Sequence, residues 1–189
     1  MPDYWFIKRI PNLLTVLNML LGLLAIILMI RGGIPYMEIT IASLIAVGGI
    51  VDFFDGYLAR KWNAVTDMGK QLDSFADLIT FGVAPVCLLY FLAAYEQSLL
   101  IVLVAITYPL AGIYRLARYN LNDFKDHFMG LPITIAGILL AAYCVGHTFW
   151  SPHIPHALCI FITVVFVLSL SAAMVSRFRV KRVPASFAD

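Results

Sequence analysis

The sequence predicts an all-α integral membrane protein with six transmembrane helices and a short interfacial helix at its N-terminus. Hydrophobic residues make up 62% of the 189-residue chain and charged residues only 13%. Soluble domains are nearer about 45–50% apolar and about 25% charged. A helix needs about 20 apolar residues to cross a bilayer, so a chain of this length with short loops has room for six. We therefore expect the lipid bilayer, and no nucleic acid, as the surrounding partner.

Clusters of Gly, Pro, Asn and Ser divide the apolar sequence into its spans, because these residues favour turns. Residues 1–11 combine aromatic side chains with Lys8 and Arg9, which is typical of an amphipathic segment at the membrane interface. Thr66 or Asp67 is expected to cap the third span. The whole chain, 1–189, is expected to form one domain, with spans at about 12–31, 37–60, 69–94, 98–120, 130–150 and 156–177.

Lysine and arginine residues fall on one side of this six-span arrangement. Twelve of the thirteen do so, and only Arg31 lies on the other side. Positive residues mark the cytoplasmic side of a membrane protein. The sequence therefore predicts a protein of the cytoplasmic (plasma) membrane with both termini in the cytoplasm.

Four aspartates stand at helical spacing near the predicted cytoplasmic ends of spans two and three. Asp52 and Asp55 share one face of the second span, and Asp73 and Asp77 share one face of the third, because residues three and four apart lie together on a helix. The turn between these spans is short, so the two faces can meet. A carboxylate at bilayer depth costs roughly 2.5–3.5 kcal/mol even on a lenient insertion scale, and neighbouring carboxylates repel one another.

Such a cluster persists if cations neutralise it. Carboxylates suit hard divalent cations, so we expect two Mg²⁺ or Mn²⁺ ions held by Asp52, Asp55, Asp73 and Asp77. Paired ions of this kind clamp a transferring phosphate group, which at a membrane indicates chemistry on a phosphate-bearing lipid. The alternative, that the aspartates are interfacial charges or helix caps, fits one aspartate better than four on two facing stripes.

The string D-x-x-D-G-x-x-A-R-x8-G-x3-D-x3-D resembles the signature of the CDP-alcohol phosphatidyltransferases. It runs from Asp52 to Asp77, and its other fixed residues are Gly56, Ala59, Arg60, Gly69, Asp55 and Asp73. The resemblance implies a six-helix membrane enzyme, usually a homodimer. In such an enzyme an alcohol attacks the lipid-side phosphate of a CDP-linked lipid, and CMP leaves.

The resemblance also implies residue roles. Asp52, Asp55 and Asp73 would hold the metals, with Asp77 as a ligand and candidate general base. Residues at the nucleotide and CDP-lipid are expected to be Gly56, Ala59, Arg60, Gly69, Asn12 and Thr15. Small side chains such as Gly56, Ala59 and Gly69 let a ligand approach the backbone closely. For Asn12 and Thr15, a hydrogen bond between helices is the other reading.

The acceptor alcohol must be inferred from other residues. Arg115 and Arg118 share a helical face, with Asn120 and Lys125 following on the same side. An arginine fork binds a carboxylate such as that of serine, and equally a phosphate such as that of glycerol 3-phosphate or inositol phosphate. The alternative is that these cations only orient the protein in the membrane and anchor lipid headgroups.

Two further strings resemble the phosphatidylserine synthase branch of the family. They are A-R-Y-N followed by F-x-G-L-P, and I-P-N-L-L-T-x-x-N at the start of the first span. The resemblance implies CDP-diacylglycerol and L-serine as substrates and phosphatidylserine as the product. A metal or cation transporter is the rival class, but its ion path would need acidic residues at more than one depth of the bilayer, whereas these cluster at one end.

Overall fold

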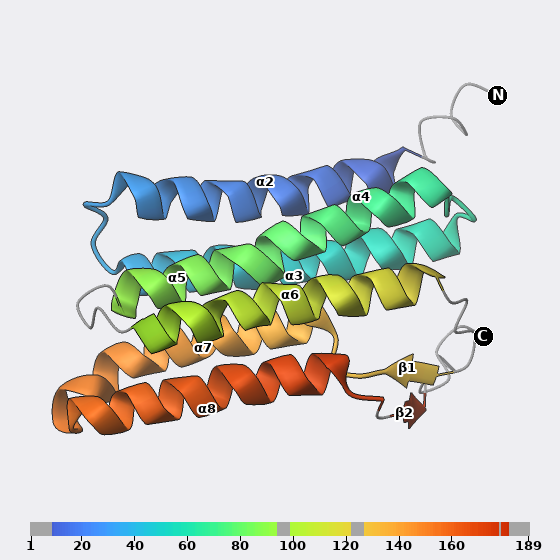
Figure 1. Ribbon diagram of the computed structural model, residues 1–189. Helices are drawn as coiled ribbons and strands as arrows, with labels where there is room; N and C mark the ends of the chain where they lie inside the picture. Colours follow the sequence, from blue (N-terminus) through green and yellow to red (C-terminus); the bar gives the residue numbers. More distant parts are fainter. Residues whose placement is uncertain (1–8, 94–98, 122–126, 178, 182–189) are drawn as a thin grey trace.

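The computed structural model of the chain is a bundle of long helices, described for residues 9–93, 99–121, 127–177 and 179–181 (Figure 1). In this described part, six helical segments are long and apolar enough to cross a membrane, which confirms the predicted fold class. The helices are α2 (Ile10–Arg31), α3 (Met37–Lys61), α4 (Asp67–Asp77), the π-helix η1 (Leu78–Val83), α5 (Ala84–Ala93), α6 (Leu99–Leu121), α7 (Ile133–Trp150), the short 3₁₀ helix η2 (Ser151–His153) and α8 (His156–Val175). The third span is the continuous run α4–η1–α5.

The helix ends differ from the predicted bounds by up to three residues. Helix α2 begins at Ile10, so Ile10 and Pro11 belong to the first membrane helix and not to an interfacial segment, since proline fits the first turn of a helix. The interfacial helix itself was predicted over residues 1–11, most of which lie outside the described residues. Helix α7 begins at Ile133, and not at 130, because Pro132 is its N-cap. The predicted cap of the third span is confirmed: the Thr66 hydroxyl accepts a hydrogen bond from the Gly69 amide at 3.0 Å.

Two short strands modify the all-α expectation. Strand β1 (His127–Met129) pairs antiparallel with β2 (Arg179–Lys181), with Phe128 opposite Val180. A pairing of three residues is too short to leave an alternating pattern in the sequence. The strands join the connection between α6 and α7 to the segment that follows α8.

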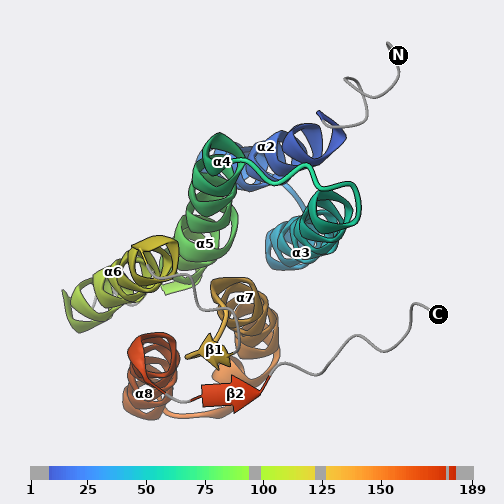
Figure 2. The same cartoon turned by 90° about the vertical axis from the view of Figure 1, so that its right-hand side faces the viewer.

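The third span lies at the centre of the bundle. Seen along the helices, α4 and α5 have α2 and α3 on one side and α6 on the other, with α7 below and α8 packed against α6 (Figure 2). The buried core includes Phe81, Leu88, Tyr108, Ile133 and Leu140, each fully shielded from solvent. Side chains that point away from this centre are largely apolar and exposed, as a lipid environment requires.

The π-helix η1 directly follows Asp77 and is held by hydrogen bonds to two other helices. The Tyr108 hydroxyl of α6 donates to the carbonyl oxygen of Phe81 at 3.2 Å. The Thr80 hydroxyl donates to the carbonyl oxygen of Asn18 in α2 at 2.9 Å. A π-turn inserts one residue into the helical register and is frequent beside functional sites. Here it separates the aspartate-bearing helix α4 from the apolar helix α5.

Replacing Gly137 with alanine should destabilise the protein by about 1–3 kcal/mol, the usual cost of overpacking. A Cβ atom at Gly137 in α7 would stand 2.7 Å from the Cα atom and from the carbonyl oxygen of Phe81, so helix η1 would have to move. The melting temperature in detergent measures this. Gly146→Ala in the same helix is the control, because its added Cβ would meet only the Trp150 ring nitrogen at 3.8 Å; equal melting temperatures for the two variants would contradict the packing argument.

Candidate functional site

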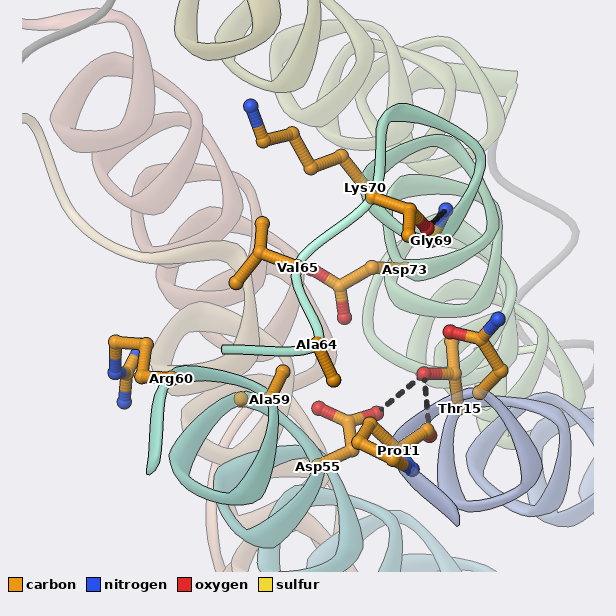
Figure 3. Close-up of a pocket in the computed structure, with 13 residues that line it drawn as sticks. Pro11, Thr15, Asp55, Ala59, Arg60, Ala64, Val65, Gly69, Lys70 and Asp73 are labelled. Atoms are coloured by element: carbon orange, nitrogen blue, oxygen red, sulfur yellow. Dashed lines mark hydrogen bonds between the residues drawn. The ribbon is translucent and has the colours of Figure 1, made fainter. Parts of the chain in front are cut away.

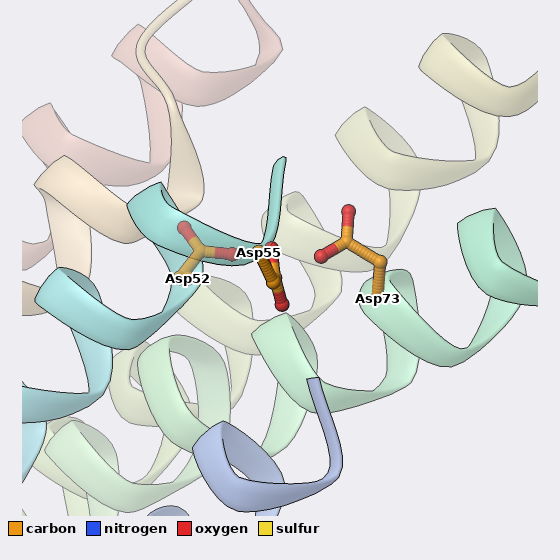
Figure 4. A group of neighbouring side chains, drawn as sticks. All are labelled: Asp52, Asp55 and Asp73. Carbon is orange, nitrogen blue, oxygen red and sulfur yellow. The ribbon is translucent and has the colours of Figure 1, made fainter. Parts of the chain in front are cut away.

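The four aspartates of the predicted cluster come from the facing ends of α3 and α4. One oxygen from each of Asp52, Asp55 and Asp73 lies within 4.8 Å of the others. Figure 4 shows the three carboxylates turned toward one another between the two helices. Asp55 is only 4% exposed. The helical spacing and the short 62–66 connection therefore bring the two acidic stripes together as the sequence predicts.

Asp77 is also buried and lies one helical turn beyond Asp73, at the end of α4. It is 8% exposed, and its carboxyl group contacts that of Asp52. Its Oδ1 atom is buried and has no hydrogen-bond partner within the described part of the chain. Arg115 of α6 is also buried, and its charge interacts with that of Asp77.

The residues present fit a divalent-cation centre. Burying several carboxylates together is costly unless their charges are compensated, and an unpaired buried oxygen is a group that normally finds a partner. The donor set is entirely oxygen, which suits Mg²⁺ or Mn²⁺ and excludes a preference for thiolate-bound metals. The arrangement can therefore hold such ions beside an incoming phosphate.

A pocket of about 210 Å³ opens between α2, α3 and α4 beside this cluster. Asp55 and Asp73 point into it from opposite walls, and the Thr15 hydroxyl reaches Asp55 from α2 (Figure 3). The structure brings all six residues expected at the nucleotide and CDP-lipid into its lining: Asn12, Thr15, Gly56, Ala59, Arg60 and Gly69. Asp52 and Asp77 are not part of this lining and lie behind it, toward α6 and α7.

The pocket also has features that attract anions. The N-terminal turns of α2 and α4 both border it, and the N-terminus of a helix carries a partial positive charge. Arg60 interacts electrostatically with Asp55 and Asp73, and Lys70 extends from the first turn of α4. Carboxylates and cations thus lie side by side, an arrangement suited to a metal-bound pyrophosphate.

The two glycines that line the pocket, Gly56 and Gly69, differ in how much room their surroundings leave for a side chain. A Cβ atom at Gly69 would crowd the Thr66 hydroxyl at 3.0 Å and the Asn12 amide oxygen at 3.1 Å, so packing within the chain accounts for it. A Cβ atom at Gly56 would meet only the Arg60 guanidinium, at 3.6 and 3.9 Å, which is ordinary contact. No contact within the described part of the chain requires a glycine at Gly56, and this fits the close approach of a ligand.

The residues expected at the acceptor alcohol do not line the pocket. Arg118 donates to the carbonyl oxygens of Val175 and Ser176 at 3.0 and 3.3 Å, so its guanidinium caps the end of α8. The Asn120 amide donates to the Ser74 hydroxyl at 2.9 Å, which ties α6 to α4. Lys125 lies outside the described residues. Of the three described residues, Arg115 is the one whose charge interacts with the cluster, through Asp77.

Sequence reasoning missed two residues at the site. Lys70 lines the pocket one position after Gly69, in a part of the motif that fixes no residue type. The Thr134 hydroxyl, at the start of α7, donates to Asp52 Oδ2 at 3.1 Å. Its only signal in the sequence was a polar residue two positions after the G-L-P turn.

Comparison with known proteins gives a consistent result. Residues 8–175 match the family model of the CDP-alcohol phosphatidyltransferases. The chain is 47% identical over 133 residues to the CDP-diacylglycerol–serine O-phosphatidyltransferase of Bacillus subtilis, an alignment that covers 69% of this chain and 72% of that protein. It is 41% identical to the protein of the same name from Methanocaldococcus jannaschii, over 73% of this chain and 61% of the other.

An archaetidylserine synthase of Methanothermobacter thermautotrophicus is 38% identical, over 71% of this chain and 57% of that protein. The chain therefore spans about three fifths of the length of these two archaeal relatives, and nearly three quarters of the bacterial one.

Proposed function

Because the chain belongs to the CDP-alcohol phosphatidyltransferase family, we propose that it transfers the phosphatidyl group of CDP-diacylglycerol to the hydroxyl group of L-serine. The products are phosphatidylserine and CMP. The observation that carries this proposal is the juxtaposition of the aspartate cluster with the pocket formed by residues at the nucleotide positions of the family signature. The names of three relatives, each of which is a serine phospholipid synthase, support serine as the acceptor.

The reaction forms a bond between the serine hydroxyl oxygen and the lipid-side phosphorus, and breaks the bond from that phosphorus to the oxygen that leaves with CMP. Two divalent cations, Mg²⁺ or Mn²⁺, held by Asp52, Asp55, Asp73 and Asp77, would neutralise charge on the phosphate oxygens. Arg60 adds a fixed positive charge on the pocket side of the cluster. Asp77, with its buried and unpaired Oδ1, is positioned to accept the proton that the serine hydroxyl loses.

Two aspartates of the cluster face the pocket and the other two face away from it, which supports the binding of donor and acceptor on opposite sides of the reacting phosphorus. Asp55 and Asp73 face the pocket, where the nucleotide end of the donor would lie. Asp52 and Asp77 face α7 and α6, where Arg115 lies. We infer that serine enters on this second side, with its carboxylate on Arg115, while Arg118 and Asn120 hold the surrounding helix ends in place.

The distribution of cations supports an orientation with the active site facing the cytoplasm. Among the described residues, nine lysines and arginines belong to the aspartate end of the bundle and Arg31 ends α2 at the opposite end: Arg9, Arg60, Lys61, Lys70, Arg115, Arg118, Arg177, Arg179 and Lys181. The resemblance to the family further supports a homodimer as the functional unit, which light scattering of the detergent-solubilised protein tests.

Removal of divalent cations should stop the reaction. With EDTA in excess, incorporation of labelled serine into lipid is expected to fall to the background, because four neighbouring carboxylates without cations repel the pyrophosphate. Adding Mg²⁺ or Mn²⁺ above the chelator concentration should restore it, whereas Na⁺ at matched ionic strength should not. Unchanged lipid labelling in EDTA would contradict the metal-assisted mechanism.

A further inference from the structure

The carboxylate of Asp52 is held from a neighbouring helix and not from its own. Thr134 lies in the first turn of α7, after the cap residue Pro132, and its hydroxyl donates to Asp52 Oδ2 at 3.1 Å. The two residues are 82 positions apart in the chain. Helices α3 and α7 pack against each other, and this packing places the Thr134 hydroxyl beside Asp52.

Asp55 is held in the same way from the opposite side of α3. The Thr15 hydroxyl of α2 donates to Asp55 Oδ2 at 2.8 Å. The same hydroxyl lies 3.1 Å from the carbonyl oxygen of Pro11, and a hydroxyl has one proton, so the carboxylate is the shorter and charge-assisted partner. Two hydroxyls from two different helices thus fix two neighbouring carboxylates.

This use of threonine differs from that of other threonines in the bundle. The hydroxyls of Thr107, Thr148 and Thr163 donate to the carbonyl oxygens of residues three or four positions earlier in their own helices. This is the ordinary arrangement for threonine within an apolar helix. Thr134 sits in the first turn, and its hydroxyl bonds to a carboxylate of the site instead.

We propose that Thr134 is a positioning residue that orients Asp52 for divalent-cation binding; this rests on the metal-binding role proposed above for the four aspartates. The bond from the Thr134 hydroxyl to Oδ2 restricts the rotation of the Asp52 carboxylate, and its remaining lone pairs face Asp77 and the rest of the cluster, where a cation would bind. Mg²⁺ requires near-ideal geometry from its ligands, and hydrogen bonds to metal-ligating groups typically account for about 10–100-fold in metal affinity.

The test is the thermal stabilisation of purified protein, without substrate, as Mn²⁺ is added. Thr134→Val keeps the shape of the side chain and removes the hydroxyl; it should raise the Mn²⁺ concentration at half-maximal stabilisation by about 10–100-fold. Thr134→Ser restores a hydroxyl and should titrate close to the wild type. Thr148→Val is the matched control in the same helix and should titrate as the wild type does, since its hydroxyl donates to the Cys144 carbonyl oxygen of α7 itself.

The outcomes separate the positioning role of Thr134 from the metal-binding role of the four aspartates. A Thr134→Val protein that melts at a lower temperature without metal, but titrates with Mn²⁺ at the wild-type midpoint, would overturn the positioning role, because the hydroxyl would then be structural only. Asp52→Asn and Asp73→Asn serve as reference variants: if they lose the Mn²⁺ response while Thr134→Val keeps it, only this inference fails. If both aspartate variants respond as the wild type does, the proposed metal site fails instead. Should Thr134→Val not fold, Thr134→Ala gives the same comparison.

Discussion

Replacing Asp73 with asparagine is expected to lower turnover on the order of 1,000-fold or more, because metal clamps supply several kcal/mol of transition-state stabilisation and each 1.36 kcal/mol is a factor of ten. Asp73 sits between the pocket and the rest of the cluster: it lines the pocket, and one of its oxygens lies within 4.8 Å of oxygens of Asp52 and Asp55. The amide keeps the shape of the side chain but loses its negative charge. Asp52→Asn, Asp55→Asn and Asp77→Asn should have effects of similar size.

The measurement is initial rate of CMP release at saturating Mn²⁺, with the melting temperature as the check on folding. Asp67→Asn is the matched control. Asp67 begins the same helix as Asp73, but its side chain is fully exposed and pairs with Lys70 at 3.7 Å. Wild-type rates in any two of the four cluster variants would contradict the two-cation mechanism.

Replacing Arg115 with alanine is expected to raise the KM for serine by about 10–100-fold, the loss that corresponds to a charged hydrogen bond worth about 1.5–3 kcal/mol. The KM for CDP-diacylglycerol should change little, because Arg115 lies behind the cluster and not in the pocket. Arg115→Lys keeps the charge but lacks the fork that binds a carboxylate through two parallel bonds, so it should recover part of the loss.

Arg118→Ala separates a direct contact from a structural one. Its guanidinium caps the end of α8, so we expect a lower melting temperature and a smaller rise in the KM for serine than for Arg115→Ala. Lys61→Ala removes an exposed cation from the same end of the bundle and should leave both KM values unchanged. An equal rise in both KM values for Arg115→Ala would place this residue at the pyrophosphate.

The sequence predicts well the features that depend on local spacing. The helical repeat puts Asp52 and Asp55 on one face of α3, and Asp73 and Asp77 on one face of α4. The connection between the two helices is only a few residues long, so the two faces lie against each other. Thr66 caps α4 through a bond that spans three residues. The six spans follow from the length of each apolar run, since that length is set by the thickness of the bilayer.

Features that depend on packing between distant segments could not be predicted in this way. Thr134 reaches Asp52 across 82 residues, and Arg118 reaches Val175 across 57. Both contacts depend on which helices are neighbours in the bundle, and hydropathy does not encode that order. The π-helix after Asp77 could not be predicted from the sequence either. It is held by tertiary hydrogen bonds of Thr80 and Tyr108, and not by the helix propensity of its own residues.

The most direct test of the proposed function is CMP release by purified protein in detergent with CDP-diacylglycerol and Mn²⁺, with serine, glycerol 3-phosphate and inositol phosphate each offered alone. We expect rapid release with serine, formation of one phosphatidylserine per CMP, and background rates with the two phosphorylated acceptors. Release with a phosphorylated acceptor and not with serine would contradict serine as the substrate, while leaving the role of the aspartates intact.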